Sequence, residues 1–424
     1  MNDENLPSHR TGLRWYWLLL LWIMSAMIIA SHRPSSLLHA QFWAEDGRIW
    51  YAQAYQQGEW LPLTHIQDGY YQTFPRLVAD LAVLFPFHLA PLVMNCAALL
   101  VQGLPVAFLF TSRAAGWGSL QIRALMALLY LTLPNSGEWH ANTTNTQWIL
   151  ALLAIMTLLA RLPRGWPGRL SDLSILSLCG VTGPFCILLA PVACLMAWYR
   201  RERWRTIYAV MLLSFSALQG YAIFITRDTM RMHQPLGASI PLLTRILAVR
   251  IFAGAVIGTF SPLSSLRVPL ILPMMIVIPS LLLMIAGLRR APLELKLFTL
   301  FGGEVLVAAL RTPMVTHVGP QWLAILNLAD ARYYLFPMLA FLLCVGHIVT
   351  TGQLLWLRIV AGVLLCMVSV GIVHNWRDYG NWRDFARYDD FPAVSRRFEA
   401  SPPGTSMTIR IEPAQLWTMT IVKH

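Results

Sequence analysis

Long apolar runs recur from one end of this 424-residue chain to the other, and they constrain its fold more than any other feature. Hydrophobic residues make up 57% of the sequence, whereas charged residues make up only 12%. A soluble globular chain carries about twice that charged fraction. Because a run of roughly 20 apolar residues can cross a bilayer as a helix, the sequence predicts an all-α polytopic membrane protein.

Short arginine clusters separate the apolar runs and predict which loops face the cytoplasm. The formal net charge is +12, yet the chain has only two lysines, Lys296 and Lys423. This distribution favours membrane lipid over nucleic acid as the partner of the basic residues, because the arginines occupy short loops. The N-terminus is expected in the cytoplasm, since Arg10 and Arg14 precede the first apolar run. We expect a bacterial inner (plasma) membrane as the location.

These signals predict about eleven spans, at roughly 20 apolar residues for a full crossing. The expected spans are 15–31, 89–112, 122–135, 147–160, 172–182, 184–199, 206–225, 268–288, 293–310, 334–350 and 356–373.

Three segments are expected to depart from a simple series of crossings. Residues 32–88, the first outer loop, are too polar to span and are rich in Trp and Tyr, which predicts short interfacial helices. The amphipathic stretch 241–258 is expected to lie in the interface rather than to cross. The bundle is expected to occupy residues 1–374, and residues 375–424 form a small extracytoplasmic tail with a β-like run at 405–411.

Two adjacent carboxylates, Glu45 and Asp46, directly follow the first apolar run. Acidic side chains at a membrane boundary are costly if they contact lipid, which indicates a functional site. Neighbouring aromatic residues such as Trp43 and Trp50 can desolvate a carboxylate and raise its basicity. The alternative is that both acids are simply solvated charges after a signal anchor.

Polar residues of other predicted outer loops join this pair on one side of the membrane, whereas the cytoplasmic loops carry mainly arginine and no acidic cluster. Arg76 also fits a plain interfacial arginine, and the run Arg332-Tyr333-Tyr334 also fits an aromatic belt. The outer-loop residues with candidate chemistry are His65, Asp68, Gly69, Tyr70, Tyr71, Pro75, Arg76, Glu138, His140, Asn142, Asn145, Gln147, Arg311, His317, Asp330, Arg332, Tyr333 and Tyr334.

The order of these elements resembles the GT-C superfamily of polytopic glycosyltransferases. Members carry a modified acidic motif in the first outer loop, which Glu45-Asp46 matches in position. Short runs that also resemble bacterial members are Gly69-Tyr70, Pro75-Arg76, Thr144-Asn145-Thr146-Gln147-Trp148, Asp330-Ala331-Arg332-Tyr333-Tyr334 and the tail Ile411-Glu412-Pro413 with Trp417.

This resemblance implies an inverting transfer of a sugar at the outer leaflet. The donor would be a sugar linked through a phosphate to a polyprenol, and the acceptor a lipid-linked or surface glycan. Asp46 would act as general base with Glu45 in support. Because several relatives carry large soluble domains where this chain has a small tail, the acceptor site would be built from loops.

The leaving lipid phosphate needs cationic donors, and bidentate arginine suits that role. Arg332 is the first candidate and Arg76 the second. The residues expected to orient sugar or phosphate are Tyr333, Tyr70, His65, Asn145 and Gln147. No cofactor is required, because arginine can neutralise a monophosphate, although a divalent metal at Glu45 and Asp46 is an open alternative.

Other classes of membrane protein remain alternatives. An O-antigen polymerase or ligase is also polytopic and acts outside, but would favour a large late outer loop. A transporter or flippase for lipid-linked glycans would need polar residues along a path through the bundle, whereas here they lie mostly at one face. A structural protein of the envelope would tolerate loss of the Asp46 carboxylate.

Overall fold

The computed structural model describes residues 12–58, 60–227, 234–258, 261–313, 319–327, 331–351, 354–377, 391–413 and 417–424. Two candidate residues from the sequence, His317 and Asp330, lie outside these ranges. The protein is mostly helical, at 74%, and its described strands form two two-stranded sheets. The expected all-α class is therefore confirmed.

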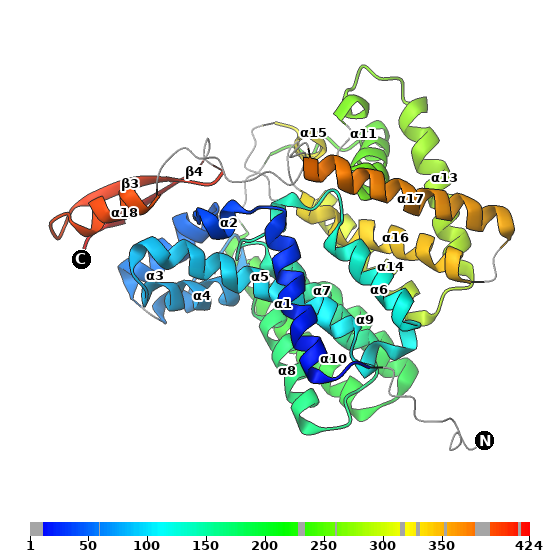
Figure 1. The fold of residues 1–424 in the computed structure, drawn as a ribbon, viewed down its shortest axis with the longest axis horizontal. Helices are drawn as coiled ribbons and strands as arrows, with labels where there is room; N and C mark the ends of the chain where they lie inside the picture. Colours follow the sequence, from blue (N-terminus) through cyan, green and yellow to red (C-terminus); the bar gives the residue numbers. More distant parts are fainter. Residues whose placement is uncertain are drawn as a thin grey trace.

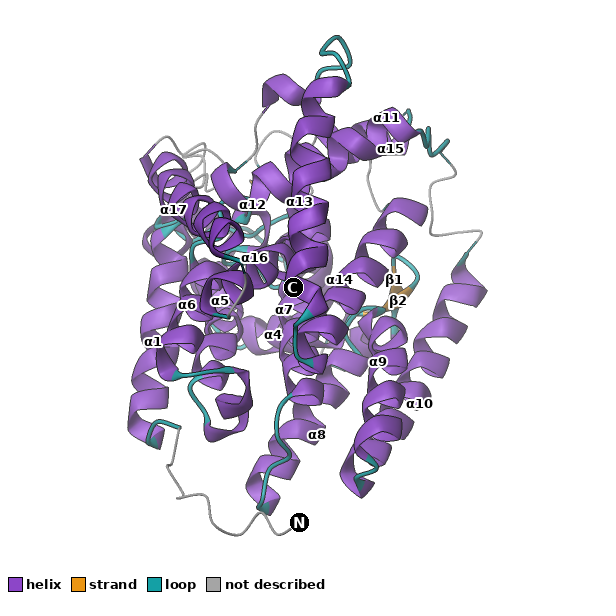
Figure 2. Cartoon of the chain, turned by 90° about the vertical axis from the view of Figure 1, so that its right-hand side faces the viewer, coloured by secondary structure: helices purple, strands orange, loops and turns teal. Residues whose placement is uncertain are grey.

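Eleven helices form the bundle or pack against it (Figure 1, Figure 2). They are α1 (Trp15–Ser31), α5 (Ala90–Leu109), α6 (Leu120–Leu131), α7 (Thr146–Leu159), α8 (Trp166–Gly180), α9 (Phe185–Arg200), α10 (Arg203–Thr226), α13 (Ile271–Arg289), α14 (Leu293–Arg311), α16 (Leu335–Thr350) and α17 (Leu355–Arg377).

Six helical runs in the described part of the chain are long and apolar enough to cross a membrane, which supports a membrane protein; eleven spans remain a prediction. These six are Phe87–Leu109, Arg203–Thr226, Ile240–Ile257, Ile271–Arg289, Ala331–Thr350 and Leu355–Trp376, and shorter apolar helices cover Trp15–Ser31, Leu120–Leu131, Thr146–Leu159 and Phe185–Arg200.

Helix α7 forms the centre of the bundle, and every one of its residues is buried. It packs against α5, α8 and α9. In contrast, the apolar helices α10, α13 and α17 leave most of their hydrophobic surface exposed. Exposed apolar surface of this extent indicates contact with lipid, because a surface in water would be polar.

Arginine contacts gather several loops at one end of the bundle. The Arg113 guanidinium donates to the backbone carbonyl of Arg161 and pairs with the Asp172 carboxylate at 2.5 Å. Arg200, at the end of α9, pairs with Glu294 of α14 at 2.8 Å. The loops that the sequence places together on one side therefore contact one another.

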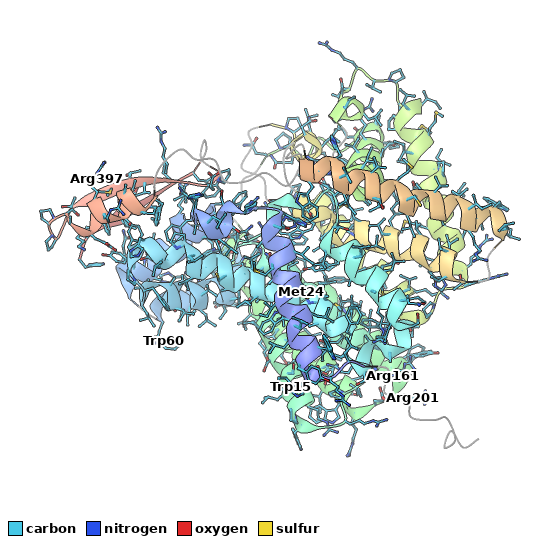
Figure 3. The ribbon with its side chains drawn as sticks, in the orientation of Figure 1. Trp15, Met24, Trp60, Arg161, Arg201 and Arg397 are labelled. Carbon is cyan, nitrogen blue, oxygen red and sulfur yellow. The ribbon has the colours of Figure 1, made fainter. Side chains whose placement is uncertain are left out.

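We call this end of the bundle the arginine face. Arg161 and Arg201 lie there beside Trp15, the first residue of α1 (Figure 3). Its assignment to the cytoplasm remains a prediction from the arginine rule. The opposite end, which carries the first outer loop and the tail, is called the cavity face below.

The first outer loop folds into short helices, as expected, and also into a small hairpin. Its elements are α2 (Ser35–Leu38), η1 (Asp46–Tyr51), α3 (Ala52–Gln57), η2 (Leu61–Thr64), β1 (Ile66–Gln67), β2 (Tyr70–Tyr71), α4 (Thr73–Val83) and η3 (Phe87–Leu89).

The C-terminal tail packs on the first outer loop. It consists of α18 (Phe391–Glu399) and an antiparallel hairpin of β3 (Ser406–Ile411) and β4 (Trp417–Val422). The hairpin is drawn in red beside α2, α3 and α4 at one end of the long axis (Figure 1). One face of the hairpin joins the apolar core of the first loop through buried residues Ile409, Ile411, Met419 and Ile421.

The tail is also hydrogen-bonded to the segment that carries the acidic pair. The backbone N–H of Ala44 donates to the carbonyl of Glu412 at 2.5 Å, and the N–H of Glu412 donates to the carbonyl of Phe42 at 2.9 Å. These two bonds hold residues 42–44 against the end of β3. The conformation of the acidic pair therefore depends on residues near the C-terminus.

The stretch expected at the interface forms one helical run, Ile240–Ile257, which comprises α11 (Ile240–Arg245), η6 (Ile246–Phe252) and α12 (Ala253–Ile257). Asn135, in the cavity-face loop after α6, donates to the carbonyl of Arg250 at 3.2 Å. Asn375, in the last turns of α17, donates to the carbonyl of Ile257 at 3.4 Å. The run is long and apolar enough to cross a membrane and packs against α13, α16 and α17, so its interfacial placement remains a prediction.

Candidate active site

A cavity of about 740 Å³ lies where the first outer loop, the loop before α7, α9, α14 and the tail meet. We call it the site cavity. Its charged lining residues are Glu45, Arg48, Asp68, Arg227, Arg311 and Arg332. Its other polar and aromatic lining residues include Gln67, Tyr70, Gln72, Thr144, Asn145, Gln147, Trp148, Gln234, Gln321, Tyr333 and Trp417.

Asp46 lies beside this cavity but does not line it. Its side chain is fully buried, and its carboxylate accepts four hydrogen bonds. Oδ2 accepts from the backbone N–H of Thr143 at 2.8 Å; Oδ1 accepts from the Thr143 hydroxyl and from the N–H and hydroxyl of Thr144 at 2.6–2.8 Å. Burial raises the pKa of Asp46, and the four donors oppose that rise.

The occupied carboxylate of Asp46 suits a positioning role better than that of a proton acceptor. Both of its oxygens are engaged by groups of the protein, so neither is directed at a substrate hydroxyl. The same four bonds fix η1 against the loop before α7. On another side, Gly47 allows η1 to pack closely on Phe42, because a Cβ there would lie 2.7 Å from Cβ of Phe42. The geometry therefore favours Glu45 over Asp46 as the base.

Arg76 does not line the cavity; it is linked through Trp50 to Thr144, one of the residues that donate to Asp46. Its side chain is buried, its guanidinium lies 4.8 Å from the centroid of the Trp50 ring, and it donates to Gln53 at 2.6 Å. The indole N–H of Trp50 in turn donates to the Thr144 hydroxyl at 3.0 Å. Arg76 is thus placed to hold Trp50 rather than to contact a ligand phosphate.

Glu45, in contrast, contributes its half-buried side chain to the cavity wall. Burial raises the pKa of Glu45, the charge of Arg332 lowers it, and the charges of Asp68 and Asp46 raise it. A carboxylate with a raised pKa is a better general base near neutral pH, provided that it is still ionised. Arg332 favours that ionised form.

Replacing Asp68 with asparagine is expected to move the pH dependence of activity. The charge of Asp68 raises the pKa of Glu45, so its removal lowers that pKa and leaves Glu45 ionised at lower pH. The acid limb of the kcat/KM profile should therefore move to lower pH. Asparagine is a suitable replacement because Asp68 has φ +56°, where Asn is tolerated. A profile that stays in place, or moves upward, would contradict the role of Glu45.

Arg332 is held in the cavity wall by Glu138, from the loop before α7. Its guanidinium pairs with one carboxylate oxygen at 2.7 Å, and its backbone N–H donates to the other at 2.9 Å. Arg332 also lies 5.2 Å from the centroid of the Tyr333 ring. Tyr333 packs edge-on against Trp148 at 5.7 Å. The sequence-predicted residues of η8 (Ala331–Tyr334) therefore reach the same cavity as Glu45.

The remaining sequence-predicted residues divide between the cavity wall and its surroundings. Tyr70, in β2, and Gln147, at the start of α7, both line the cavity. Asn145 lines it as well, and its amide donates to the Glu138 carbonyl at 3.1 Å. His65 precedes β1 and is not a lining residue. The structure thus brings six of the nine predicted residues to the cavity and places Asp46, Arg76 and His65 outside its wall.

Three buried polar atoms in the cavity wall have no hydrogen-bond partner within the described residues. They are Oε1 of Gln72, Oδ1 of Asn145 and Nε1 of Trp148. Two of them accept hydrogen bonds and one donates. These atoms add to the polarity of the residues that form the wall, but they lie beneath its accessible surface.

Several cavity residues escaped the sequence analysis as site residues. Arg48 lies one turn after Glu45, and Trp417 was noted only within a tail motif. Arg227 ends α10, where an arginine after an apolar run is read as a topology signal. Their positions at the ends of apolar segments were visible, but their convergence depends on the tertiary fold.

A divalent ion does not fit the pair Glu45 and Asp46. The oxygens of Asp46 are already occupied by the four donors from Thr143 and Thr144, so the pair cannot offer two free carboxylates to one ion. Among the described residues, no group of three His, Cys, Asp or Glu side chains is arranged to hold a metal.

The fold and the cavity together define a helical membrane protein with an acid and arginine cavity at one end of its bundle. No protein-family model matches the chain, and no curated protein matches its sequence.

Proposed function

We propose that this chain is a membrane glycosyltransferase that moves a sugar from a polyprenyl-phosphate donor to a lipid-linked or surface glycan. The observation that carries the proposal is the site cavity itself, where a half-buried carboxylate, Glu45, shares the wall with several guanidinium groups. A transfer of this kind needs a base for the acceptor hydroxyl and cations for the leaving phosphate.

The composition of the cavity wall supports a carbohydrate ligand. Amide side chains offer a donor and an acceptor each, as sugar hydroxyls do, and aromatic rings pack against the apolar faces of pyranoses. A polyol therefore matches this lining, whereas a purely apolar ligand does not.

The membrane-helix side of the cavity supports a lipid-linked donor. The helices α9 and α14 contribute an apolar wall, including Leu188, Val305 and Ala308. Arg311, at the end of α14, and Arg332 stand at the polar end of that wall. An amphiphile that joins a phosphate to a long apolar chain matches a cavity with both arginine and apolar lining, since arginine binds phosphate strongly.

The proposed reaction is a single displacement at the anomeric carbon. Glu45 takes the proton of the acceptor hydroxyl, whose oxygen forms the new glycosidic bond as the bond from the anomeric carbon to the phosphate oxygen breaks. The phosphate leaves with that electron pair, and Arg332 stabilises its charge. Attack opposite to the leaving group inverts the anomeric centre. Asp46 holds Glu45 in place through η1.

A transporter is less well supported, because the central helix α7 offers little polarity away from the cavity. Beyond Gln147 its sequence runs through apolar residues to Leu159, with Thr157 as the polar exception. The class of acceptor, and hence the distinction from a glycan polymerase or ligase, is left to experiment.

Glycan analysis of membranes tests the proposal directly. Cells that contain the chain are expected to carry a sugar substituent that is missing from cells without it, and the substituent should return when the wild-type chain is supplied. Mass spectrometry of released envelope glycans and of lipid-linked saccharides measures this. Identical glycans in both strains, with the protein present in the membrane, would refute the transferase proposal.

A further inference from the structure

Trp417 extends the hairpin of the tail into the site cavity. Residues 417, 419 and 421 share one face of β4, because side chains alternate along a strand. Met419 and Ile421 are fully buried in the core of the first outer loop, whereas Trp417 is half-buried and lines the cavity. The face of β4 that anchors the hairpin therefore also presents the Trp417 ring to the site cavity.

The tail fixes the position of the Trp417 ring relative to the segment that precedes the proposed base, Glu45. Trp417 pairs with Ile411 in the hairpin, and the next residue, Glu412, is hydrogen-bonded to the segment 42–44. The Arg48 guanidinium lies 5.5 Å from the centroid of the Trp417 ring. Glu45, Arg48 and Trp417 all line the site cavity, so the ring borders the same ligand space as the proposed base.

We propose that Trp417 is the stacking platform for the acceptor pyranose, a role that rests on the proposed glycosyl transfer. The ring belongs to the part of the cavity wall that the first loop and the tail contribute, whereas α9 and α14 contribute the apolar part that suits the donor lipid. A pyranose ring presents C–H groups to the face of an indole, which carries a negative electrostatic potential. The ligand class is therefore a hexopyranoside.

Ligand-observed NMR on the full-length protein in lipid nanodiscs tests this without requiring turnover. The probes are methyl glucopyranoside, methyl galactopyranoside and methyl mannopyranoside, and sugar-headgroup detergents are avoided because they would compete. Saturation transfer to the ring C–H protons of at least one probe is expected for the wild type. It should fall about fivefold in Trp417→Ala and be largely kept in Trp417→Phe.

Trp60→Ala is the matched control, because Trp60 is an exposed tryptophan of the first outer loop that points away from the body of the protein (Figure 3). This variant should give the wild-type signal. Thermal unfolding checks that Trp417→Ala folds, as expected from the four remaining hairpin anchors. Equal signals in Trp417→Ala and wild type, or no signal in the wild type, would overturn the platform.

The result is separable from the transferase proposal. Binding that depends on Trp417, together with unchanged envelope glycans, would keep the sugar site and reject the transfer reaction. Altered glycans without any Trp417-dependent binding would keep the transferase and reject the platform.

Discussion

Replacing Glu45 with glutamine is expected to lower sugar transfer by about 10²–10⁴-fold, the usual contribution of a general base. Glutamine has the same shape but cannot accept the acceptor's proton. Because the side chain lines a cavity and is only half-buried, the change leaves no set of buried donors unpaired. Expression and thermal stability should therefore match the wild type. The measurement is the initial rate of substituent addition in isolated membranes.

Two other acids provide the controls for this variant. Glu45→Asp keeps a carboxylate at a shorter reach and should retain part of the rate. Asp68→Asn removes a second carboxylate from the same cavity and should keep most of the rate at its new pH optimum. A rate for Glu45→Gln within about threefold of the wild type would exclude Glu45 as the base.

Replacing Asp46 with alanine is expected to destabilise the protein by about 3–5 kcal/mol, because four donors then lose a buried charged partner. These donors are the backbone and hydroxyl groups of Thr143 and Thr144. Activity should be lost together with folded protein in the membrane, unlike in Glu45→Gln. Thermal unfolding in nanodiscs and the amount of folded protein measure the effect.

Graded variants check that the hydrogen bonds are the cause. Asp46→Asn keeps one acceptor oxygen but turns an amide toward a donor, so it should lose less stability than Asp46→Ala. Thr143→Val removes one hydroxyl donor and should cost about 1 kcal/mol. A stable but inactive Asp46→Asn would instead return the role of base to Asp46.

The sequence located the region of the candidate site but could not assign the roles within it. Glu45 and Asp46 are adjacent, and Glu45 precedes η1 whereas Asp46 begins it, so one side chain can line a cavity while the other is buried. Which one does so depends on Thr143 and Thr144, nearly a hundred residues later. No local pattern specifies that contact.

The contribution of the tail was equally difficult to predict. Alternation in residues 405–411 indicated one strand, and its partner strand forms the hairpin that packs on the first loop. The acceptor side was expected to consist of loops, yet Trp417 comes from a strand. Its approach to Arg48 spans most of the chain, and such distant pairings leave no periodic signal.

The hydrogen bonds that join Glu412 to Phe42 and Ala44 also limit the number of membrane crossings between these residues. Two residues that share a hydrogen bond lie on the same side of the membrane, so an even number of complete crossings must separate them. Between them the described chain has ten of the bundle helices and the run Ile240–Ile257, an odd total. At least one of these eleven helical runs must therefore enter and leave on the same side of the membrane.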